Sequence, residues 1–233
     1  MHSYISGGKT IEVVQYQPAR AGKFPALLIV HGSSGPMSSF IGGYAQRLAD
    51  FGYVLFFVHY FDRTDTSYAG PQAIETHFPA WIETLTEAID YAVEHPKVDA
   101  ERIGFLGFSL GGFLSLSLAS QEPRIGAAVS IVGGIPEYFA ERARRMPPVL
   151  VLHGEADTKV PVKEAYRVEQ LLKKLNTPYE IKIYPGQGHF FQGAAQIDAL
   201  TRAFGFLQKN LHGKSSWNVL APLLTQLLRV ATS

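Results

Sequence analysis

A serine flanked by glycines stands at a change of backbone pattern near the middle of the chain. The segment Gly107-Phe-Ser-Leu-Gly-Gly112 follows a short apolar run, 103–106, and opens an apolar stretch at helical spacing, 110–121. In a sharp strand-to-helix turn the serine hydroxyl rises above the sheet, and small residues are needed where neighbouring backbone leaves no room for a β-carbon. The free N–H groups of the helix start favour negative charge there. Ser109 is thus a candidate nucleophile, the alternative being a plain Gly-Ser turn.

A serine hydroxyl attacks a carbonyl only when a base removes its proton, and no residue beside Ser109 in the sequence can do so. Of the eight histidines, His189 is the best placed, in a glycine-loosened loop after the last predicted strand. A carboxylate that accepts the other ring proton would fix the imidazole tautomer. Asp157 suits this role because it also follows a predicted strand, and Glu155 is its rival.

The remaining histidines have other expected roles. His31 and His153 each precede a glycine at the end of a strand, and we expect them to be structural or to shape the oxyanion hole. His59 also ends a strand and is a weaker candidate for contact with substrate. The others are expected to face solvent: His2, His77, His95 and His212.

Acyl transfer also requires donors for the oxyanion of the tetrahedral intermediate. One is typically the backbone N–H after the nucleophile, and the second comes from the loop after an early strand. Leu110 would supply the first. The turn 31–35 follows the predicted strand 26–30 and would supply the second through the N–H of Ser33, with Ser34 as the alternative. An ordinary glycine turn is the structural interpretation of the same segment.

Composition restricts the class of protein. The 233 residues are 46% hydrophobic and 18% charged, which is typical of a globular chain with a sizeable core, and the net charge of +1 does not favour nucleic-acid binding. The absence of cysteine excludes disulfides, thiolate metal sites and a cysteine nucleophile. We expect no membrane partner, since no stretch approaches the length of an apolar span. Without a recognisable targeting segment at the N-terminus, the cytoplasm is the expected location.

Apolar runs of strand length alternate with helical patterns along the chain. This alternation predicts an α/β fold in one domain, 1–212, with a mainly parallel sheet, helices on both faces and a ligand crevice at the carboxyl ends of the strands. The predicted strands are 26–30, 53–58, 103–106, 127–132, 149–152 and 179–184. The predicted helices are 39–51, 80–95, 110–121, 163–175 and 192–211.

Two segments depart from the alternation. Residues 60–79 have a weak pattern, and a loop of that length is usually functional or mobile, so this segment is a lid candidate. The extension 213–233 places Trp217, Leu220 and Leu224 on one helical face. An amphipathic C-terminal helix of this kind must cover apolar surface, either on its own chain or in a homodimer.

Taken together, these segments resemble the α/β-hydrolase superfamily and, within it, the dienelactone hydrolase family. The resemblance extends over about residues 16–211 and rests on four segments: His31-Gly-Ser-Ser-Gly35, Gly107-Phe-Ser-Leu-Gly-Gly112, Gly154-Glu-Ala-Asp157-Thr-Lys-Val-Pro161 and Gly188-His189-Phe190. The order of nucleophile, acid and base is also that of the superfamily. The resemblance implies hydrolysis of small carboxylic esters or lactones through an acyl-enzyme, without metal or organic cofactor.

The resemblance also bears on the substrate. Founding members use a cysteine nucleophile with a glutamate in the first hole-forming loop, whereas this chain has Ser109 and Gly32. Those members hold a substrate carboxylate with two arginines; Arg63 would match the first, and Gly193 stands at the second position. Further substrate contacts are expected from three aromatic residues near the site: Tyr60, Phe108 and Phe190.

Two other functions fit the same residues. A Ser-His-Asp triad also cleaves thioesters and amides, so a thioesterase or a prolyl-oligopeptidase-like peptidase is an alternative. A non-catalytic binding protein that keeps the fold is a second alternative, although such a protein would have no reason to retain all three residues in matching places.

Overall fold

A computed structural model describes residues 2–36 and 45–212 of the chain. The C-terminal helix expected within 213–233 lies outside these residues, as does part of the helix expected over 39–51, of which residues 45–50 are helical. The expected dimer contact through the C-terminal extension therefore stays a prediction.

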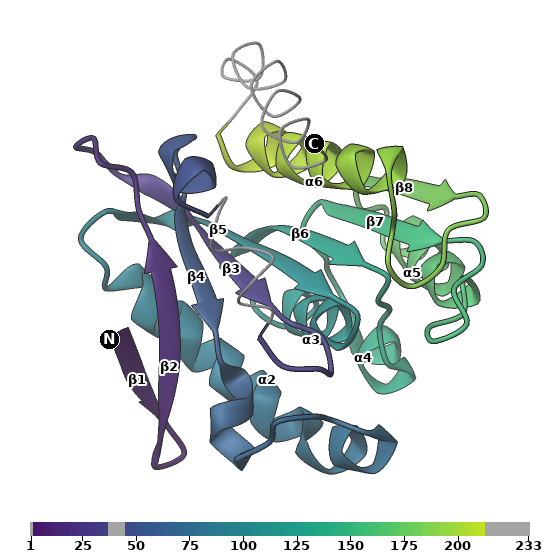
Figure 1. Cartoon of the computed structure of the whole chain (residues 1–233), viewed down its shortest axis with the longest axis horizontal. Helices are drawn as coiled ribbons and strands as arrows, with labels where there is room; N and C mark the ends of the chain where they lie inside the picture. The colour runs from purple at the N-terminus through teal and green to yellow at the C-terminus, as the bar shows by residue number, and fades with distance from the viewer. Residues whose placement is uncertain (1, 37–44, 213–233) are drawn as a thin grey trace.

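One eight-stranded sheet forms the centre of the molecule, in the order β1-β2-β4-β3-β5-β6-β7-β8 (Figure 1). The pairs β1–β2 and β2–β4 are antiparallel, and the other pairs are parallel. The predicted α/β fold with a mainly parallel sheet is therefore confirmed. The strands are β1 His2–Ser6, β2 Lys9–Tyr16, β3 Phe24–Val30, β4 Val54–Val58, β5 Val98–Phe108, β6 Ile125–Ile131, β7 Val149–Gly154 and β8 Tyr179–Tyr184.

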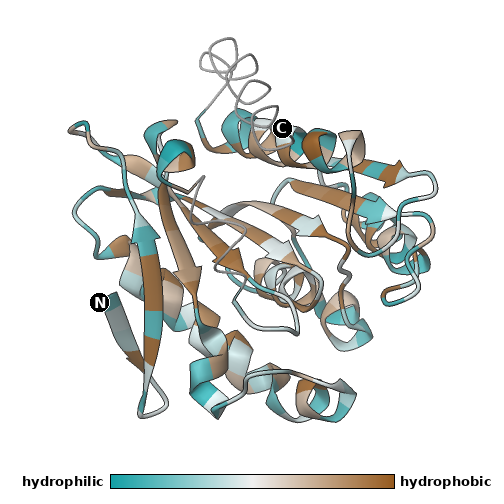
Figure 2. Cartoon of the chain, viewed as in Figure 1, coloured by the Kyte–Doolittle hydropathy of each residue, from teal (hydrophilic) through white to brown (hydrophobic). Residues whose placement is uncertain are grey.

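Helices cover both faces of the sheet, because successive side chains of a central strand point to opposite sides. In β3, Leu28 joins the apolar cluster under α2, α3 and α5, and Leu27 joins the cluster under residues 45–50 and α6. The central strands are accordingly apolar along much of their length (Figure 2). The helices are α2 Pro71–Val93, α3 Leu110–Ala119, α4 Glu137–Arg142, α5 Lys163–Lys174 and α6 Ala194–Leu211; the short α4 was not predicted.

The chain changes direction across the sheet at β3. From β3 it passes to β4 on one side, and it then returns to β5 on the other side of β3. In open α/β sheets the ligand crevice lies at the carboxyl ends of strands around such a switch point. Register places the end of β3 beside the end of β5, with Val30 opposite Gly107. The loops after these strands therefore meet at one edge.

The N-terminal hairpin was missed by the sequence analysis. Strands β1 and β2 pair with Ser6 opposite Lys9, which leaves a two-residue Gly7-Gly8 turn in which both glycines have positive φ. Such turns favour Gly-Gly, and the burial of Ile11 and Val13 follows the alternation of a half-exposed strand. The Gly-Gly turn and the alternation of apolar residues are both visible in the sequence. The hairpin was not predicted because it is antiparallel and does not belong to the alternation of strands and helices.

The long loop expected over 60–79 is wrong, and the lid role proposed for it stays a prediction. Residues Tyr60–Thr64 form a 3-10 helix, η1, and α2 already begins at Pro71. Pro79 lies inside α2 on an exposed position, where the lost backbone hydrogen bond is least costly because water can reach the freed carbonyl. The spacing of Ile74, Phe78 and Trp81 is helical and continues into the buried face of α2.

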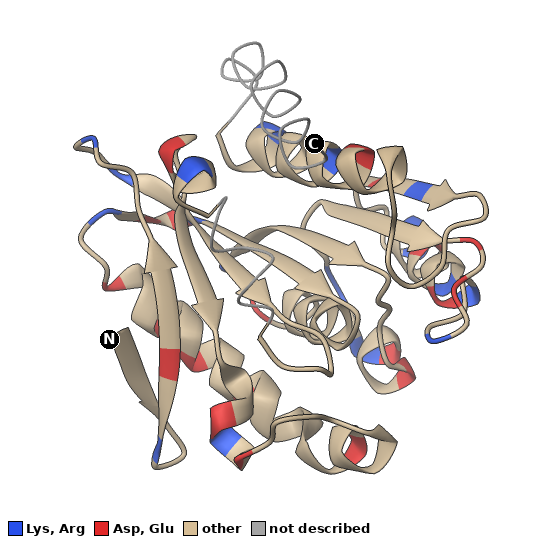
Figure 3. Cartoon of the chain, in the orientation of Figure 1, with Lys and Arg blue, Asp and Glu red and all other residues tan. Residues whose placement is uncertain are grey.

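Charged residues lie mainly on helices, loops and strand ends, which leaves the middle of the sheet without Lys, Arg, Asp or Glu (Figure 3). Within the described ranges, no helix combines the length and apolar character required to cross a bilayer.

The close packing of α3 on the sheet gives a stability prediction. A methyl group at Gly111 would collide with the carbonyl oxygen of Val30, which is backbone and cannot turn away. We expect Gly111→Ala to lower the free energy of unfolding by at least about 1–3 kcal/mol, the usual cost of overpacking. Urea denaturation measures this. In the matched variant Gly70→Ala the added carbon meets only Tyr68 at 4.0 Å, so a change below about 1 kcal/mol is expected. An equal loss of unfolding free energy in the two variants would contradict the claim that the backbone contact between Gly111 and Val30 leaves no room for a β-carbon.

Candidate active site

Ser109 occupies a strained turn between β5 and α3. Its φ of 55° and ψ of −118° lie in a region that non-glycine residues rarely adopt. The turn is enforced from both sides, because a β-carbon at Gly107 would collide with the carbonyl of Gly111 and one at Gly111 with the carbonyl of Val30. The N–H of Ser109 donates to the carbonyl of Ile131 on β6 at 2.9 Å, which holds the turn against the sheet.

The three side chains proposed from the sequence meet at this edge. The Ser109 hydroxyl lies 2.9 Å from Nε2 of His189, and Nδ1 of His189 lies 2.8 Å from Oδ2 of Asp157. All three are buried, with exposed fractions of 8%, 9% and 6% for serine, histidine and aspartate. The distances allow the serine hydroxyl to donate to the imidazole and the imidazole to donate to the carboxylate. The geometry is that of a nucleophile, a base and an orienting acid.

The loops after β7 and β8 hold Asp157 and His189 together. The N–H of Ala156 donates to the carbonyl of Gln187 at 2.9 Å, and a β-carbon at Gly154 would collide with the carbonyls of Gln187 and Gly188. The two loops therefore touch along their backbones. Both residues follow neighbouring strands that pair with each other, and these backbone contacts between the loops add to that placement.

The carboxylate of Asp157 has fixed partners for both oxygens. Oδ1 accepts the N–H groups of Lys159 and Val160 at 2.8 and 2.9 Å, and Oδ2 faces His189. These two backbone donors fix the rotation of the carboxylate. The rival Glu155 is exposed and accepts the N–H of Gly186 at 3.2 Å instead.

The loop after β3 lies against the nucleophile. A β-carbon at Gly32 would stand 3.3 Å from the β-carbon of Ser109, so only a glycine allows this approach without a shift. Ser33 is half-buried and its carbonyl accepts the N–H of Ala69 at 2.9 Å, whereas Ser34 is exposed. Leu110 is the first residue of α3, a position whose N–H has no partner within the helix. These are the two predicted oxyanion donors, and their role stays a proposal.

Tyr60 does not face substrate, contrary to the prediction. Its side chain is completely buried; the hydroxyl donates to the carbonyl of His31 at 2.9 Å, and its ring stacks on the His31 imidazole at 4.2 Å between centroids. His31 in turn approaches the Gly32 carbonyl through Nδ1 at 2.8 Å. Tyr60 therefore supports the loop after β3 from below, and the structural role expected of His31 agrees with these contacts.

Arg63 is also wrongly predicted as a substrate ligand. Its guanidinium donates to the carbonyl of Gly7 at 2.9 Å and to Glu83 at 3.1 Å. Gly7 lies in the turn of the N-terminal hairpin, and Glu83 lies on α2. The hairpin was not predicted from the sequence, so the contact with Gly7 could not be predicted either. Through Nη1 and Nη2, which bind a carbonyl and a carboxylate, Arg63 joins η1 to its neighbours. The structure assigns it no contact in the site.

Phe108 and Phe190 flank the imidazole. The ring of Phe190 stacks on that of Phe108 at 5.5 Å, and both rings stand edge-on to His189, at 5.3 and 5.4 Å. Phe190 is 51% exposed, and the Lys159 ammonium lies 5.3 Å from its ring centre. The two rings thus form an aromatic wall beside the base that remains open to solvent, as a substrate surface would.

The structure bears on several of the lesser histidine expectations. His59 approaches Glu12 at 3.8 Å, on the neighbouring strand β2. His212, expected to face solvent, packs against the Tyr53 ring at 4.8 Å, and burial lowers its pKa to about 4. His153 is fully buried beside Asp157, as a structural residue would be.

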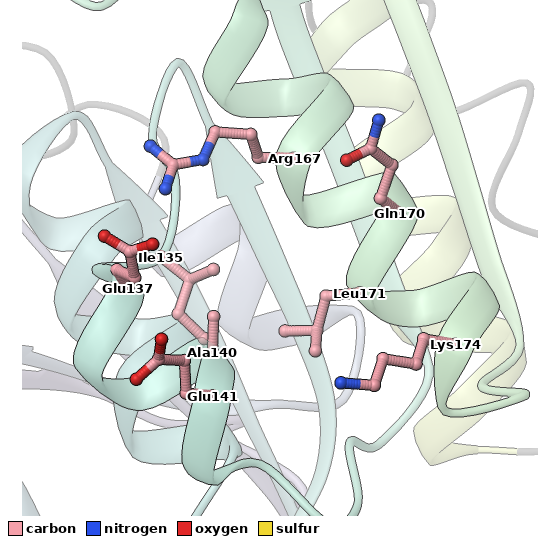
Figure 4. A pocket seen from close by; sticks show the side chains of 8 residues that line it. All are labelled: Ile135, Glu137, Ala140, Glu141, Arg167, Gln170, Leu171 and Lys174. Atoms are coloured by element: carbon pink, nitrogen blue, oxygen red, sulfur yellow. The ribbon is translucent and has the colours of Figure 1, made fainter.

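A groove of about 250 Å³ lies between α4 and α5 and contains none of the three site residues (Figure 4). Acidic side chains from α4 face basic ones from α5 across a small apolar floor. Its lining comprises Ile135, Glu137, Ala140, Glu141, Arg167, Gln170, Leu171 and Lys174. Over the described part of the chain, no cluster of three or more His, Asp or Glu residues is arranged to hold a metal ion.

The fold and the site define an α/β-hydrolase, and comparison with known proteins gives the family. The profile of the dienelactone hydrolase family matches residues 11–211. The chain therefore belongs to the dienelactone hydrolase family, a family of hydrolases, as the resemblance predicted.

Individual relatives differ in their named activities. A Synechocystis sp. protein provisionally named a carboxymethylenebutenolidase is 27% identical over 75% of this chain and 78% of its own length. Acyl-coenzyme A thioesterase 1 of Homo sapiens is 31% identical, but the match covers 71% of this chain and only 36% of the thioesterase. A dienelactone hydrolase-like promiscuous phosphotriesterase from metagenomic libraries has a TM-score of 0.77 at 18% identity, over 89% of this chain and 96% of that one.

The buried imidazole of His31 gives a prediction for stability against pH. Burial lowers its pKa to about 4, below the imidazole value of 6.5. The unfolded chain therefore binds a proton at mildly acidic pH that the folded chain does not, and this destabilises the folded state as the pH falls from above 6.5 towards 4. Between pH 8 and pH 5 the loss attributable to His31 is about 2 kcal/mol.

Urea unfolding of the wild type and of His31→Phe at both pH values measures this difference. The phenyl ring keeps the stack on Tyr60 and cannot titrate, so the variant should lose about 2 kcal/mol less stability over the same pH interval. Equal losses in the two proteins would show that His31 takes up its proton in the folded state as readily as in the unfolded one.

Proposed function

We propose that this protein is a serine hydrolase that cleaves small carboxylic esters or lactones through an acyl-enzyme. The observation that carries the proposal is the hydrogen-bonded chain from Ser109 through His189 to Asp157, with distances of 2.9 and 2.8 Å. Membership of the dienelactone hydrolase family supports hydrolysis as the reaction class. The positive φ of Ser109 at the start of α3 supports its role as nucleophile.

In the first half of the proposed reaction, the Ser109 oxygen attacks the ester carbonyl carbon while its proton passes to Nε2 of His189. Asp157 accepts the hydrogen bond from Nδ1 and stabilises the imidazolium that forms. Collapse of the tetrahedral intermediate breaks the bond to the alcohol oxygen. The imidazolium returns the proton to that oxygen, so the alcohol leaves neutral and the acyl group remains on Ser109.

In the second half, His189 removes a proton from water, the hydroxide adds to the acyl carbon, and the acid leaves as Ser109 regains its proton. Both tetrahedral intermediates carry an oxyanion. The N–H of Leu110 is oriented by α3, and that of Ser33 belongs to the loop that Gly32 brings against the nucleophile. Two such preorganised donors stabilise the charge without reorganisation during the reaction.

The substrate side of the proposal rests on the aromatic wall. Phe190 stacks on Phe108 and stays half exposed next to His189, so an apolar acyl or alcohol group bound there would remove ring surface from water. The one site cation proposed from the sequence, Arg63, is bound to Gly7 and Glu83. The proposal therefore names neutral, apolar esters or lactones as the first substrates to test.

A thioester substrate is the second candidate, because several relatives are acyl-coenzyme A thioesterases with up to 31% identity. A peptide substrate is favoured by a Bacillus subtilis relative named as an uncharacterized peptidase, 25% identical over 81% of this chain. The same triad chemistry cleaves all three bonds. Turnover of a p-nitrophenyl ester, an acyl thioester and a peptide anilide at equal concentration ranks them, and the proposal expects the ester to be fastest.

The nucleophile is tested by Ser109→Ala. Removal of the hydroxyl leaves the imidazole without a group to activate, and kcat for a p-nitrophenyl ester should fall by about 10⁴-fold or more. The matched variant is Ser117→Ala, also on α3, where the buried hydroxyl has no hydrogen-bond partner among the described residues. Its kcat should stay within about twofold of wild type. Retained esterase activity in Ser109→Ala would rule out the proposed mechanism.

The aromatic wall is tested by Phe190→Ala. Loss of a ring contact of about 0.5–1.5 kcal/mol should raise KM for an aromatic or long-chain ester by about two- to tenfold, while leaving an acetate ester nearly unchanged. Tyr166→Ala is the control, because Tyr166 is similarly exposed, at 45%, and lies on α5. An equal effect of Phe190→Ala on both esters would remove the wall from substrate recognition.

A further inference from the structure

A second imidazole lies beside the carboxylate of the proposed triad and is not used by the mechanism. His153 belongs to β7 and its side chain is completely buried. Its Nε2 lies 2.8 Å from the carbonyl oxygen of Val160 and 3.6 Å from Oδ2 of Asp157. The same Oδ2 receives Nδ1 of His189 at 2.8 Å. Two imidazoles thus stand on one carboxylate oxygen, at unequal distances.

The partners of His153 fix its tautomer. A carbonyl oxygen can only accept, so Nε2 must carry the proton that binds Val160. With Nε2 unprotonated, its lone pair would face two oxygen acceptors, which is repulsive. Nδ1 is buried and has no hydrogen-bond partner among the described residues, so no acceptor there favours a proton on that atom. His153 is therefore the neutral Nε2–H tautomer.

The surroundings keep His153 neutral. Burial lowers its pKa, and the proximity of His189 acts in the same direction. The carboxylates of Asp157 and Glu164 and the Val160 carbonyl oppose this change, but the effect of burial is larger. As a neutral donor, His153 can bind the Val160 carbonyl without adding a positive charge beside Asp157. The negative charge of Asp157 then remains available to His189.

Val160 connects this imidazole to the carboxylate. Its carbonyl is bound by His153, and its N–H donates to Oδ1 of Asp157 at 2.9 Å. Fixing the carbonyl side of Val160 restrains the short loop 157–160 whose N–H groups set the rotation of the carboxylate. That rotation in turn directs Oδ2 at His189. Two successive hydrogen bonds therefore connect His153 through Val160 to Asp157.

We propose that His153 is a positioning residue for the hydrolytic reaction, holding the 157–160 loop so that Asp157 directs His189 toward Ser109. This inference rests on the proposed function. Displacement of catalytic groups by about 1 Å can cost about 10²-fold in rate, so a loosened carboxylate should be visible in kcat rather than in KM. A less well held Asp157 also stabilises the imidazolium of the base less, which makes that base protonate at lower pH.

The experiment compares His153→Phe with His153→Gln. The phenyl ring preserves the packing but has no donor for Val160, whereas the glutamine amide places an N–H near the position of Nε2. In His153→Phe, we expect kcat for a p-nitrophenyl ester to fall by about 10- to 100-fold, KM to stay within about twofold, and the acid limb of the kcat profile to move to lower pH. His153→Gln should recover most of kcat and the wild-type acid limb.

The control is His212→Phe, which makes the same change at a half-buried histidine that packs on Tyr53. Its kcat, and the acid limb of its kcat profile against pH, should match those of the wild type. The end point of fluorophosphonate labelling gives the concentration of active enzyme, and all rates are divided by that concentration. A merely structural role of His153 would lower the count of active enzyme and leave the acid limb in place. That result, or a loss in His153→Phe that His153→Gln does not restore, would overturn the proposal.

Nitrogen NMR of the wild type gives a second readout that does not depend on activity. With the His153 resonances assigned by their absence in His153→Gln, Nε2 should carry the proton and Nδ1 should be bare at neutral pH. A proton on Nδ1 at neutral pH would also overturn the proposal. If the wild type neither turns over an ester nor reacts with a fluorophosphonate, the proposed function itself fails, which is distinguishable from failure of the His153 inference.

Discussion

The close approach of α3 to the strands below it is the constraint on which the site depends. Backbone atoms of Gly107, Gly111 and Val30 stand nearer to one another than any β-carbon allows. The chain can turn from β5 into α3 within one residue only because of this approach, and that residue, Ser109, is driven into a conformation with positive φ and negative ψ. The strain is offset by the burial of the sheet around it, so the hydroxyl is held above the strand ends rather than folded back into the core.

The other parts of the site follow from where the strands of the sheet end. Asp157 follows β7, His189 follows β8, and the loop carrying Ser33 follows β3, so each is placed by parallel pairing with a neighbour. Backbone contacts between the β7 and β8 loops then align carboxylate and imidazole. The strands and their paired loops therefore fix the positions of the site residues. Side-chain hydrogen bonds, such as the one from His153 to Val160, then adjust their orientation.

Much of this arrangement could be predicted from the sequence, because its signals are local. The glycines around Ser109 report a turn that only glycine permits, and the strand-end positions of Asp157 and His189 follow from short apolar runs. Arg63 and Tyr60 were wrongly predicted because their partners are distant in sequence: Gly7 and Glu83 for the first, His31 for the second. No local pattern reports such contacts. The helix through Pro79 was missed because its proline is tolerated on an exposed face.

The central claim, that Ser109 is the residue on which the acyl group is carried, is tested most directly by mapping the covalent adduct. The protein is trapped with a fluorophosphonate, digested, and fragmented in the mass spectrometer to locate the added mass. The account predicts one phosphonyl group per chain, on Ser109, and none when His189 is replaced by alanine under the same exposure. An adduct on any other residue, or no adduct on a folded wild-type protein that hydrolyses esters, would contradict it.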